Sequence, residues 1–375
     1  MDEKDLAKMR VVVAMSGGVD SSVAAALMKE AGHDVVGLAM KTHSLAPKAN
    51  RACCTPDDMR DARLIADQLE IPFFVLPYEQ VFVDEIITPF AEAYRDGYTP
   101  NPCVDCNDKV KFKPLLERAQ LLGADVLATG HYAQVHETDD GYSLGRGVDA
   151  GKDQSYFLYR LTQNQLKRVA FPLGGMTKPE VRDHARRFGF ALADKHESQE
   201  ICFVGQEGYA ATVEKILGEG GREGHFVHVD GKVIGKHQGI HRYTIGQRKG
   251  LGISWHEPLY VVDIDAQQGA VWVGPRSALD VSRLFVERIH WSSDNPPAIG
   301  EEFIVQQRYR GKPTPCRLLD WDASKRLAHL EFLGPEPRGA PGQAAVFYDD
   351  DRVIGGGVIA PNRGATQITS LPIVG

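Results

Sequence analysis

The stretch from residue 11 to residue 22, VVVAMSGGVDSS, constrains the fold of this chain more than any other. Val11–Ala14 is a short run of small and apolar residues, which predicts a buried strand of a parallel sheet. Ser16-Gly17-Gly18 follows, and the apolar run from Val19 to Ala31 then predicts a helix. A strand, a glycine turn and a helix in this order point backbone N–H groups and a helix N-terminus at an anion. The sequence therefore predicts a phosphate-binding corner.

Two familiar phosphate loops do not match this corner. No Gly-Lys-Ser/Thr follows the glycines, so the corner is not a Walker A loop, and the spacing is not that of GxGxxG. An ordinary strand–turn–helix corner is the other interpretation. It leaves unexplained why Ser-Gly-Gly-x-Asp-Ser, with its flexible backbone and hydroxyl donors, comes directly after a strand.

Strand-like and helix-like runs alternate from about residue 10 to residue 205. This alternation predicts an α/β fold with a doubly wound parallel sheet, whose ligands bind at the carboxyl ends of the strands. Three loops that carry polar residues fall there: the glycine corner, the stretch after Met40, and Thr129–Tyr132. The further predicted strands are Val35–Met40, Phe73–Leu76 and Asp125–Ala128, and the further predicted helices are Asp57–Leu69, Val81–Tyr94 and Phe112–Leu122.

The rest of the chain predicts two smaller domains and a tail. At 375 residues the chain is long enough for several cores. We expect the α/β domain with the phosphate-binding corner at 1–207, a small central domain at 208–279, a C-terminal β-barrel at 280–361 and a tail at 362–375 without periodicity. The central domain should contain a helix at Tyr209–Leu217 and strands at Leu259–Ile264 and Ala270–Val273; the barrel strands are expected at Phe303–Tyr309, Cys316–Leu319, Ala328–Phe332, Ala344–Tyr348 and Arg352–Ile359.

Net charge and hydropathy indicate which classes of partner, nucleic acid or membrane, the chain can bind. The net charge of −7 gives no overall attraction to nucleic acid, so RNA binding would need local basic patches, each of which alone is typical of a solvated face. No run approaches a membrane helix and the N-terminus is polar, which predicts a cytoplasmic protein with no membrane partner. The basic patches are Lys109/Lys111/Lys113, Arg182/Arg186/Arg187, Arg242/Arg248/Lys249 and Arg308/Arg310/Lys312.

Six cysteines do not make a disulfide scaffold in a chain of this length. The prolines around Cys103-x-x-Cys106 predict a loop, and this pair could be redox-active, bind metal or do neither. A zinc site normally has a second pair at similar spacing, and there is none. Spacing alone favours a buried structural thiol for Cys202 and a core position for Cys316, and Cys53-Cys54 is weak evidence by itself.

Nearly the whole chain, about residues 10–360, resembles the tRNA-specific 2-thiouridylases, a family of PP-loop ATP pyrophosphatases. The resemblance implies ATP-dependent 2-thiolation of the wobble uridine of tRNA: adenylylation of the C2 oxygen, then sulfur transfer with release of AMP and pyrophosphate. It rests on SGGVDSS (16–22), Cys53-Cys54-Thr55, Asp61-Ala62-Arg63, NPCVDCN (101–107), Lys111-Phe112, TGHYA (129–133), GKDQSYFL (151–158), SQEICF (198–203), YTIGQRKGLGI (243–253), RYR (308–310) and PGQAAVFYDDDRVIGGGVI (341–359).

The family's roles carry over residue by residue. Cys202 matches the cysteine that carries a persulfide, and Cys106 matches the nucleophilic, resolving cysteine. The ATP-binding positions, with Mg as the nucleotide's counter-ion, are Ala14, Met15, Ser16, Gly17, Gly18, Val19, Asp20, Ser21, Met40 and Gly130. The positions expected to contact tRNA and its target base are Asn101, Pro102, Cys103, Lys152, Asp153, Gln154, Arg308 and Tyr309. The implied partners are tRNAs for Lys, Glu and Gln and a sulfur-donor protein such as a cysteine desulfurase or persulfide relay.

One position departs from the family. Many members have an aspartate where this chain has Cys103, and Asp105 would point elsewhere on an extended loop. Cys103, Cys106 and Cys202 could instead hold a [4Fe-4S] cluster whose open iron binds hydrosulfide; otherwise no metal site is expected. In the persulfide route, Lys109 and Lys111 are hypothesised to lower the pKa of Cys106.

Two other functions remain open from the residues. Another PP-loop ligase that adenylates its substrate would explain SGGVDSS but gives Cys106 and Cys202 no role. A non-catalytic tRNA-binding protein with a degenerate ATP site is the second, and the intact glycine corner argues against it.

Overall fold

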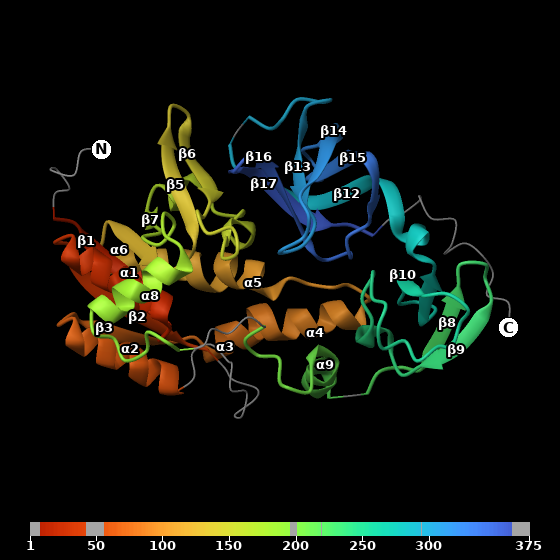
Figure 1. The fold of residues 1–375 in the computed structure, drawn as a ribbon, viewed down its shortest axis with the longest axis horizontal. Coiled ribbons are helices and arrows are strands. Elements are labelled where there is room, and N and C mark those ends of the chain that lie inside the picture. The colour runs from red at the N-terminus through yellow and green to blue at the C-terminus, as the bar shows by residue number, and fades with distance from the viewer. Residues whose placement is uncertain (1–7, 43–55, 196–200, 219, 294, 362–375) are drawn as a thin grey trace. The chain divides into compact units, whose positions relative to one another are not determined.

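The computed structural model describes residues 8–42, 56–195, 201–218, 220–293 and 295–361 (Figure 1). Contacts divide the chain into two compact units. The first unit consists of Met1–Ile86, Cys103–Gln206 and Asp351–Val353; the second consists of Ile87–Pro102, Glu207–Asp350 and Ile354–Gly375. No helix in the described part of the chain is long and apolar enough to cross a membrane.

A five-stranded parallel sheet in the order β3-β2-β1-β4-β7 is the centre of the first unit. β1 is its middle strand, and Val11, Val12 and Val13 are completely buried, which explains a strand that is apolar on both faces. This confirms the predicted α/β class. The strands are β1 (Arg10–Ala14), β2 (Asp34–Lys41), β3 (Phe73–Pro77), β4 (Val126–Thr129) and β7 (Val169–Ala170).

Helices cover both faces of this sheet. α1, α2 and α8 share one core with Val11, Val13 and Val35, while α6 packs against β1 and β4. Figure 1 shows α8 beside α1. The helical elements of the unit include α1 (Val19–Glu30), α2 (Pro56–Gln68), α3 (Glu79–Phe82), the π-helix η1 (Val83–Ile87), α5 (Pro102–Asp105), the π-helix η2 (Cys106–Phe112), α6 (Lys113–Leu121), η3 (Ser155–Phe157), α7 (Gln163–Leu166) and α8 (Lys178–Arg187).

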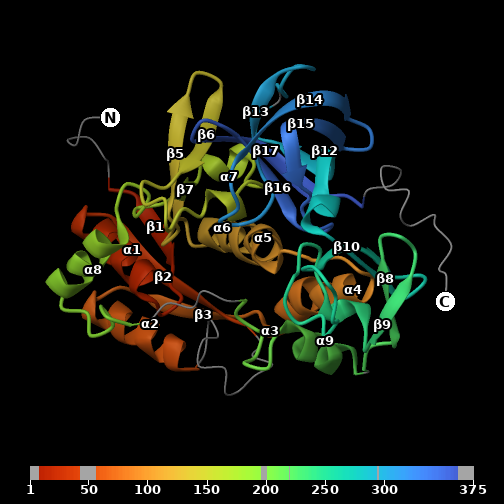
Figure 2. The ribbon, with the colours of Figure 1, turned by 45° about the vertical axis from the view of Figure 1, so that its right-hand side comes forward.

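A β-hairpin that the sequence analysis did not anticipate completes the first unit. β5 (Ala133–Thr138) pairs with β6 (Gly141–Arg146) across a turn at Asp139-Asp140 (Figure 2). The dipeptide and the following Gly141, which has a φ of 126°, are a turn signal that could have revealed the hairpin.

The second unit contains a four-stranded sheet in the order β10-β11-β8-β9 and a helix pair. α9 (Tyr209–Leu217) packs against α4 (Thr88–Arg95), where the rings of Tyr94 and Tyr209 stack 4.8 Å apart. The strands are β8 (Gly224–His228), β9 (Val233–His237), β10 (Tyr260–Asp265) and β11 (Ala270–Gly274), with short 3-10 helices at η4 (Ile240–Arg242) and η5 (Arg276–Leu279).

The same unit also contains a closed antiparallel barrel, which confirms the predicted C-terminal architecture. Pairing of β12 with β17 closes the order β12-β15-β14-β13-β16-β17. β12 was not predicted, because its first half, Asp-Val-Ser-Arg-Leu-Phe, mixes charged, polar and apolar residues without a regular alternation. The strands are β12 (Asp280–Trp291), β13 (Glu302–Gln306), β14 (Thr314–Asp322), β15 (Leu327–Pro337), β16 (Ala344–Asp349) and β17 (Arg352–Ile359).

Candidate active site

The predicted nucleotide positions come together at the carboxyl edge of the parallel sheet. Ala14 ends β1 and lies in register with Leu38 of β2 and Thr129 of β4. Met40 lies two residues beyond Leu38, and Gly130 directly follows Thr129. The glycine corner, Met40 and Gly130 therefore share one edge of three adjacent strands, where doubly wound sheets bind ligands.

Two glycines allow the corner to pack this closely. Gly17 has a φ of 74°, and a Cβ there would lie 2.1 Å from the backbone oxygen of Asp58 in α2. A Cβ on Gly130 would lie 2.7 Å from the backbone nitrogen of Ser21. Both positions need glycine because another backbone occupies the space of a side chain.

The N-terminus of α1 is open to an anion. Gly18 precedes the helix and supplies no side-chain cap. The hydroxyl of Ser21 accepts from the Ser16 N–H at 3.1 Å and donates to the Gly18 carbonyl at 3.2 Å, and the Ser22 hydroxyl donates to the same carbonyl at 2.9 Å. The hydroxyls thus hold the loop, and the first-turn N–H groups of α1 remain available to phosphate oxygens.

A buried ammonium lies beside the first turn of α1. Lys178, at the start of α8, places Nζ 2.7 Å from Oδ1 of Asp20 and is 7% exposed. The hydroxyl of Tyr132 donates to the same oxygen at 2.8 Å. The Lys178 ammonium therefore neutralises the carboxylate of Asp20, and both groups, which come from distant parts of the sequence, hold it in place.

Lys195 joins the glycine corner to α2. Its Nζ donates to the Gly17 carbonyl at 3.1 Å and to Asp58 and Asp61 at 2.7 Å each. Burial opposes the charge, but the hydrogen bonds to the two carboxylates outweigh it and raise the pKa of Lys195. The conformation of Gly17 is thus stabilised both by packing against α2 and by the hydrogen bond from Lys195.

The cysteine pair lies on a helix, so the predicted loop was wrong. α5 begins at Pro102 and continues without a break into η2 at Cys106. The N–H of a first helical residue has no partner within the helix, so proline loses no hydrogen bond there, and its fixed φ is that of a helix. Pro102 therefore starts the helix. Three-residue spacing on a helix puts Cys103 and Cys106 on one face; Cys103 is exposed and Cys106 is half-buried.

Arg160 fixes the helix that carries these cysteines. Its Nη1 donates to Oδ1 of Asp105 at 2.6 Å and lies 3.5 Å from Oδ2 of Asp108. Burial opposes the guanidinium charge, but Tyr159 and Asp105 outweigh it and raise the pKa of Arg160. Asp105, the carboxylate left where the family's aspartate is missing, is therefore already bound. Lys109, expected to lower the pKa of Cys106, pairs with Glu85 at 3.1 Å.

Replacing Arg160 by Gln should destabilise the protein by about 2–3 kcal/mol, because Asp105 would keep a half-buried charge without its partner. Asp105→Asn should lower the free energy of unfolding by a similar amount. The loss in the double variant should be smaller than the sum of the two single losses by at least about 0.5 kcal/mol. Urea unfolding of the three variants measures this coupling. Arg276→Gln, which breaks an exposed pair with Asp280, is the control and should cost less than about 1 kcal/mol. Strictly additive effects would contradict the role of this pair.

Cys202 is half-buried, in the same unit as Cys106. The ring of its neighbour Phe203 contacts Phe82 of α3 at 5.9 Å, and α3 packs against η2. Cys106 begins η2, and Cys202 precedes a residue that packs on α3, so both cysteines lie in segments that contact the α3–η2 pair. Among the described residues, no three His, Cys, Asp or Glu side chains are placed to hold a metal ion, so the three cysteines do not form a cluster site as arranged here. Cys53, Cys54 and residues 198–200 lie outside the described residues.

The segment 152–154 connects to the glycine corner. Gln154 accepts from the Tyr132 N–H at 2.9 Å, and the Tyr132 hydroxyl reaches Asp20. Asp153 is buried and accepts four hydrogen bonds, from Arg146, Gly147 and both donors of Ser155. Its carboxylate therefore organises the segment, and Lys152 is the half-exposed cation beside it.

His131, next to Gly130, is held in its neutral form. Its Nδ1 lies 2.7 Å from the Thr129 hydroxyl, and its ring packs between Phe112 and Phe171. Burial, and secondarily the charge of Lys111, lower the pKa of His131 to about 3. At neutral pH this ring adds a hydrogen-bonding group and no charge to the edge of the sheet.

The remaining predicted RNA-contact residues belong to the second unit. Asn101 ends an extended segment whose Thr99 and Pro100 carbonyls accept from Gln343, at 3.0 and 3.2 Å. Arg308 and Tyr309 lie in a turn after β13, with Arg308 exposed.

Lys178, Lys195 and Arg160 had no predicted role. Tyr132 and Asp61 lay within quoted motifs, also without a role. The carboxylate and carbonyl partners of the side chains of Lys178, Lys195 and Arg160 lie between 52 and 178 residues away in sequence, as the contacts of Arg160 with Asp108 and of Lys195 with Gly17 illustrate. No local pattern signals such pairs.

Comparison with known proteins identifies the family. The chain matches three family models: a tRNA methyl transferase HUP domain at residues 9–206, a tRNA methyl transferase PRC-barrel domain at 210–275 and an aminomethyltransferase beta-barrel domain at 281–359. It is 49% identical to a tRNA-specific 2-thiouridylase of Geotalea uraniireducens over 95% of this chain and 96% of that protein. It is 50% identical to one of Azorhizobium caulinodans over 95% of this chain and 93% of that protein. The chain therefore belongs to the tRNA-specific 2-thiouridylase family.

Proposed function

We propose that this chain is a tRNA-uridine 2-sulfurtransferase that uses ATP, bound with Mg, to place sulfur at C2 of the wobble uridine. The observation that supports this most directly is the glycine corner: an uncapped α1 N-terminus, two glycines without room for a Cβ, and a neutralised Asp20 at one sheet edge. Such a site holds pyrophosphate and leaves the adenylyl half free to react. The two cysteines of the family lie in the same unit.

In the first step, the C2 oxygen of uridine attacks the α-phosphorus of ATP. The bond from this phosphorus to the bridging oxygen breaks, and pyrophosphate leaves with the electron pair. Oxide is a poor leaving group, whereas the adenylylated oxygen can leave as AMP. The α1 N-terminus stabilises the charge that develops on pyrophosphate.

In the second step, the terminal sulfur of a Cys202 persulfide attacks C2, and AMP departs. Attack of the Cys106 thiolate on Sγ of Cys202 then breaks the S–S bond and releases the thiocarbonyl product. A Cys106–Cys202 disulfide remains, and an external dithiol must reduce it before the next turnover. Cys106 can alternatively cleave the persulfide first and release hydrosulfide as the nucleophile. A sulfur-donor protein reloads Cys202, and the substrates by family resemblance are tRNAs for Lys, Glu and Gln.

Anaerobic thiolation of unmodified tRNA tests the proposal. Iron-free and iron–sulfur-reconstituted protein are supplied with ATP and a persulfide donor, and 2-thiouridine is measured by nucleoside mass spectrometry. We expect product from the iron-free protein and a fall of at least about a thousandfold for Cys202→Ser and Cys106→Ser, since each removes a bond-forming sulfur.

Cys103→Ser and Cys316→Ala are the matched controls. The persulfide route predicts that both retain most of the activity, because Cys103 forms no bond in it and Cys316 is buried in the barrel. Product only after reconstitution, together with inactive Cys103→Ser, would establish the cluster route instead. Full 2-thiouridine formation by Cys106→Ser and Cys202→Ser would refute the roles assigned to these cysteines, and failure of all proteins to form 2-thiouridine would refute the proposed function.

A further inference from the structure

We propose that the hollow beneath the loop 246–253 in the second unit binds one nucleotide of the tRNA, outside the positions that the family resemblance assigns to tRNA contact. The inference rests on the proposed function, because it takes tRNA to be the substrate. The hollow has a volume of about 480 Å³, within the range of sites that hold a small ligand or a single nucleotide.

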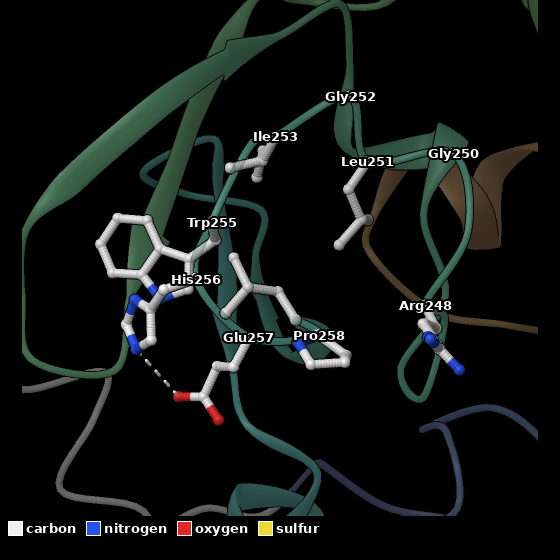
Figure 3. A pocket seen from close by; sticks show the side chains of 10 residues that line it. Arg248, Gly250, Leu251, Gly252, Ile253, Trp255, His256, Glu257 and Pro258 are labelled. Carbon is white, nitrogen blue, oxygen red and sulfur yellow. Dashed lines mark ion pairs between the residues drawn. The ribbon is translucent and has the colours of Figure 1, made fainter.

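The shape of the hollow is set by glycines and its walls by apolar groups. Gly246, Gly250 and Gly252 all have positive φ values, so the loop turns sharply three times within seven residues. Leu251, Ile253, Trp255, Pro258 and Leu259 line the interior. Figure 3 shows Arg248 on the opposite side of the hollow from Trp255 and His256. An apolar floor with a cation and an imidazole at its rim suits a base or ribose with its phosphate outside.

Arg248 and Lys249 differ in their charge pairing from the arginines of α8 and from their neighbour Arg242. Arg186 and Arg187 pair with Asp194 and Glu30, and Arg242 pairs with Glu214. Arg248 and Lys249 are exposed, and neither has an ion-pair partner in the described part of the chain. Their charges therefore remain available to phosphate in a chain whose net charge is −7.

Two further groups at the hollow have hydrogen-bonding capacity. The indole Nε1–H of Trp255 is buried without an acceptor among the described residues. His256 is exposed and lies 3.6 Å from Glu257, the one carboxylate that lines the hollow. Trp255 packs between the His228 and His256 rings at 5.1 and 5.3 Å, so the exposed imidazole of His256 is the surface on which a base would stack.

The test compares Arg248→Gln/Lys249→Gln with Lys232→Gln/Arg276→Gln, which removes one lysine and one arginine from the same unit that are paired with Asp230 and Asp280. Affinity for unmodified transcribed tRNA is measured by fluorescence anisotropy over a salt series. We expect the first variant to bind about tenfold more weakly, with a salt slope smaller by about 2, and the second to change both much less.

A footprint gives a readout that does not depend on a substitution. Acylation of Lys249 in the wild-type protein, followed by mass spectrometry, should slow about tenfold at a tRNA concentration ten times Kd, while Lys232 should react at an unchanged rate. If tRNA binds the wild-type protein but leaves Lys249 reactive and the variant's affinity unchanged, the nucleotide site is refuted and the proposed function stands. Protection of Lys249 by a sulfur-donor protein and not by tRNA also refutes it. If wild-type protein binds no tRNA, the proposed function fails and this inference fails with it.

Discussion

Replacing Gly17 by Ala should reduce ATP-dependent thiolation by at least about a hundredfold. The new Cβ would lie 2.1 Å from the Asp58 carbonyl oxygen, a backbone atom that cannot rotate away. The φ of 74° adds strain for any residue with a side chain. The loop must therefore move away from α2, which displaces the N–H groups that would hold pyrophosphate and breaks the hydrogen bond from Lys195 to the Gly17 carbonyl.

Gly32→Ala is the matched control for this substitution. Gly32 follows the other end of α1 and has a φ of 88°, but a Cβ there meets no atom within 4 Å. We expect Gly32→Ala to cost about 1 kcal/mol of stability from φ alone and to leave thiolation unchanged. Thermal unfolding and 2-thiouridine formation are measured for both variants. Equal activity of the two would show that close packing on α2 does not set the geometry of the loop.

The features that the sequence predicted well are those that local chemistry determines. The run Val11–Ala14 is apolar because both faces of a central strand are covered, and the glycines follow where the chain must turn toward a ligand. Tyr209–Leu217 and Arg352–Ile359 have the predicted bounds because helix periodicity and strand composition are also local properties.

The features that it missed depend on tertiary contacts. Pro102 predicts a loop when it is considered alone, but it begins a helix here because the residues after it continue one. Arg186 and Arg187 look like an RNA patch in sequence, but Arg186 pairs with Asp194, and Arg187 pairs with Glu30 of α1, which lies 157 residues earlier in the sequence. No local sequence pattern predicts that Lys178 and Lys195 belong to the site, because only the tertiary fold brings them beside the glycine corner. The division into domains at 207 and 279, and the ATP and tRNA positions, stay predictions.

Removing the ammonium of Lys178 should weaken the use of ATP about a hundredfold, mostly through KM for ATP. Lys178 neutralises Asp20 in the first turn of α1, next to the expected phosphate position. Without it, the carboxylate would repel the triphosphate: two unit charges about 5 Å apart at an effective dielectric constant of 20 interact by about 3 kcal/mol. Steady-state thiolation of tRNA by Lys178→Met at varied ATP measures the change.

A second substitution separates neutralisation of Asp20 from direct binding of phosphate. If Lys178 acts by neutralising the carboxylate, Lys178→Met/Asp20→Asn should recover most of the lost ATP affinity, because the repelling charge is gone while Tyr132 can still hydrogen-bond to residue 20. If the ammonium itself binds the phosphates, the double variant should be at least as impaired as Lys178→Met. Asp20→Asn alone is informative as well, since in the first case it should change KM for ATP by only a few-fold. The sign of the coupling between Lys178 and Asp20 thus distinguishes a lysine that neutralises Asp20 from a lysine that binds the phosphates directly.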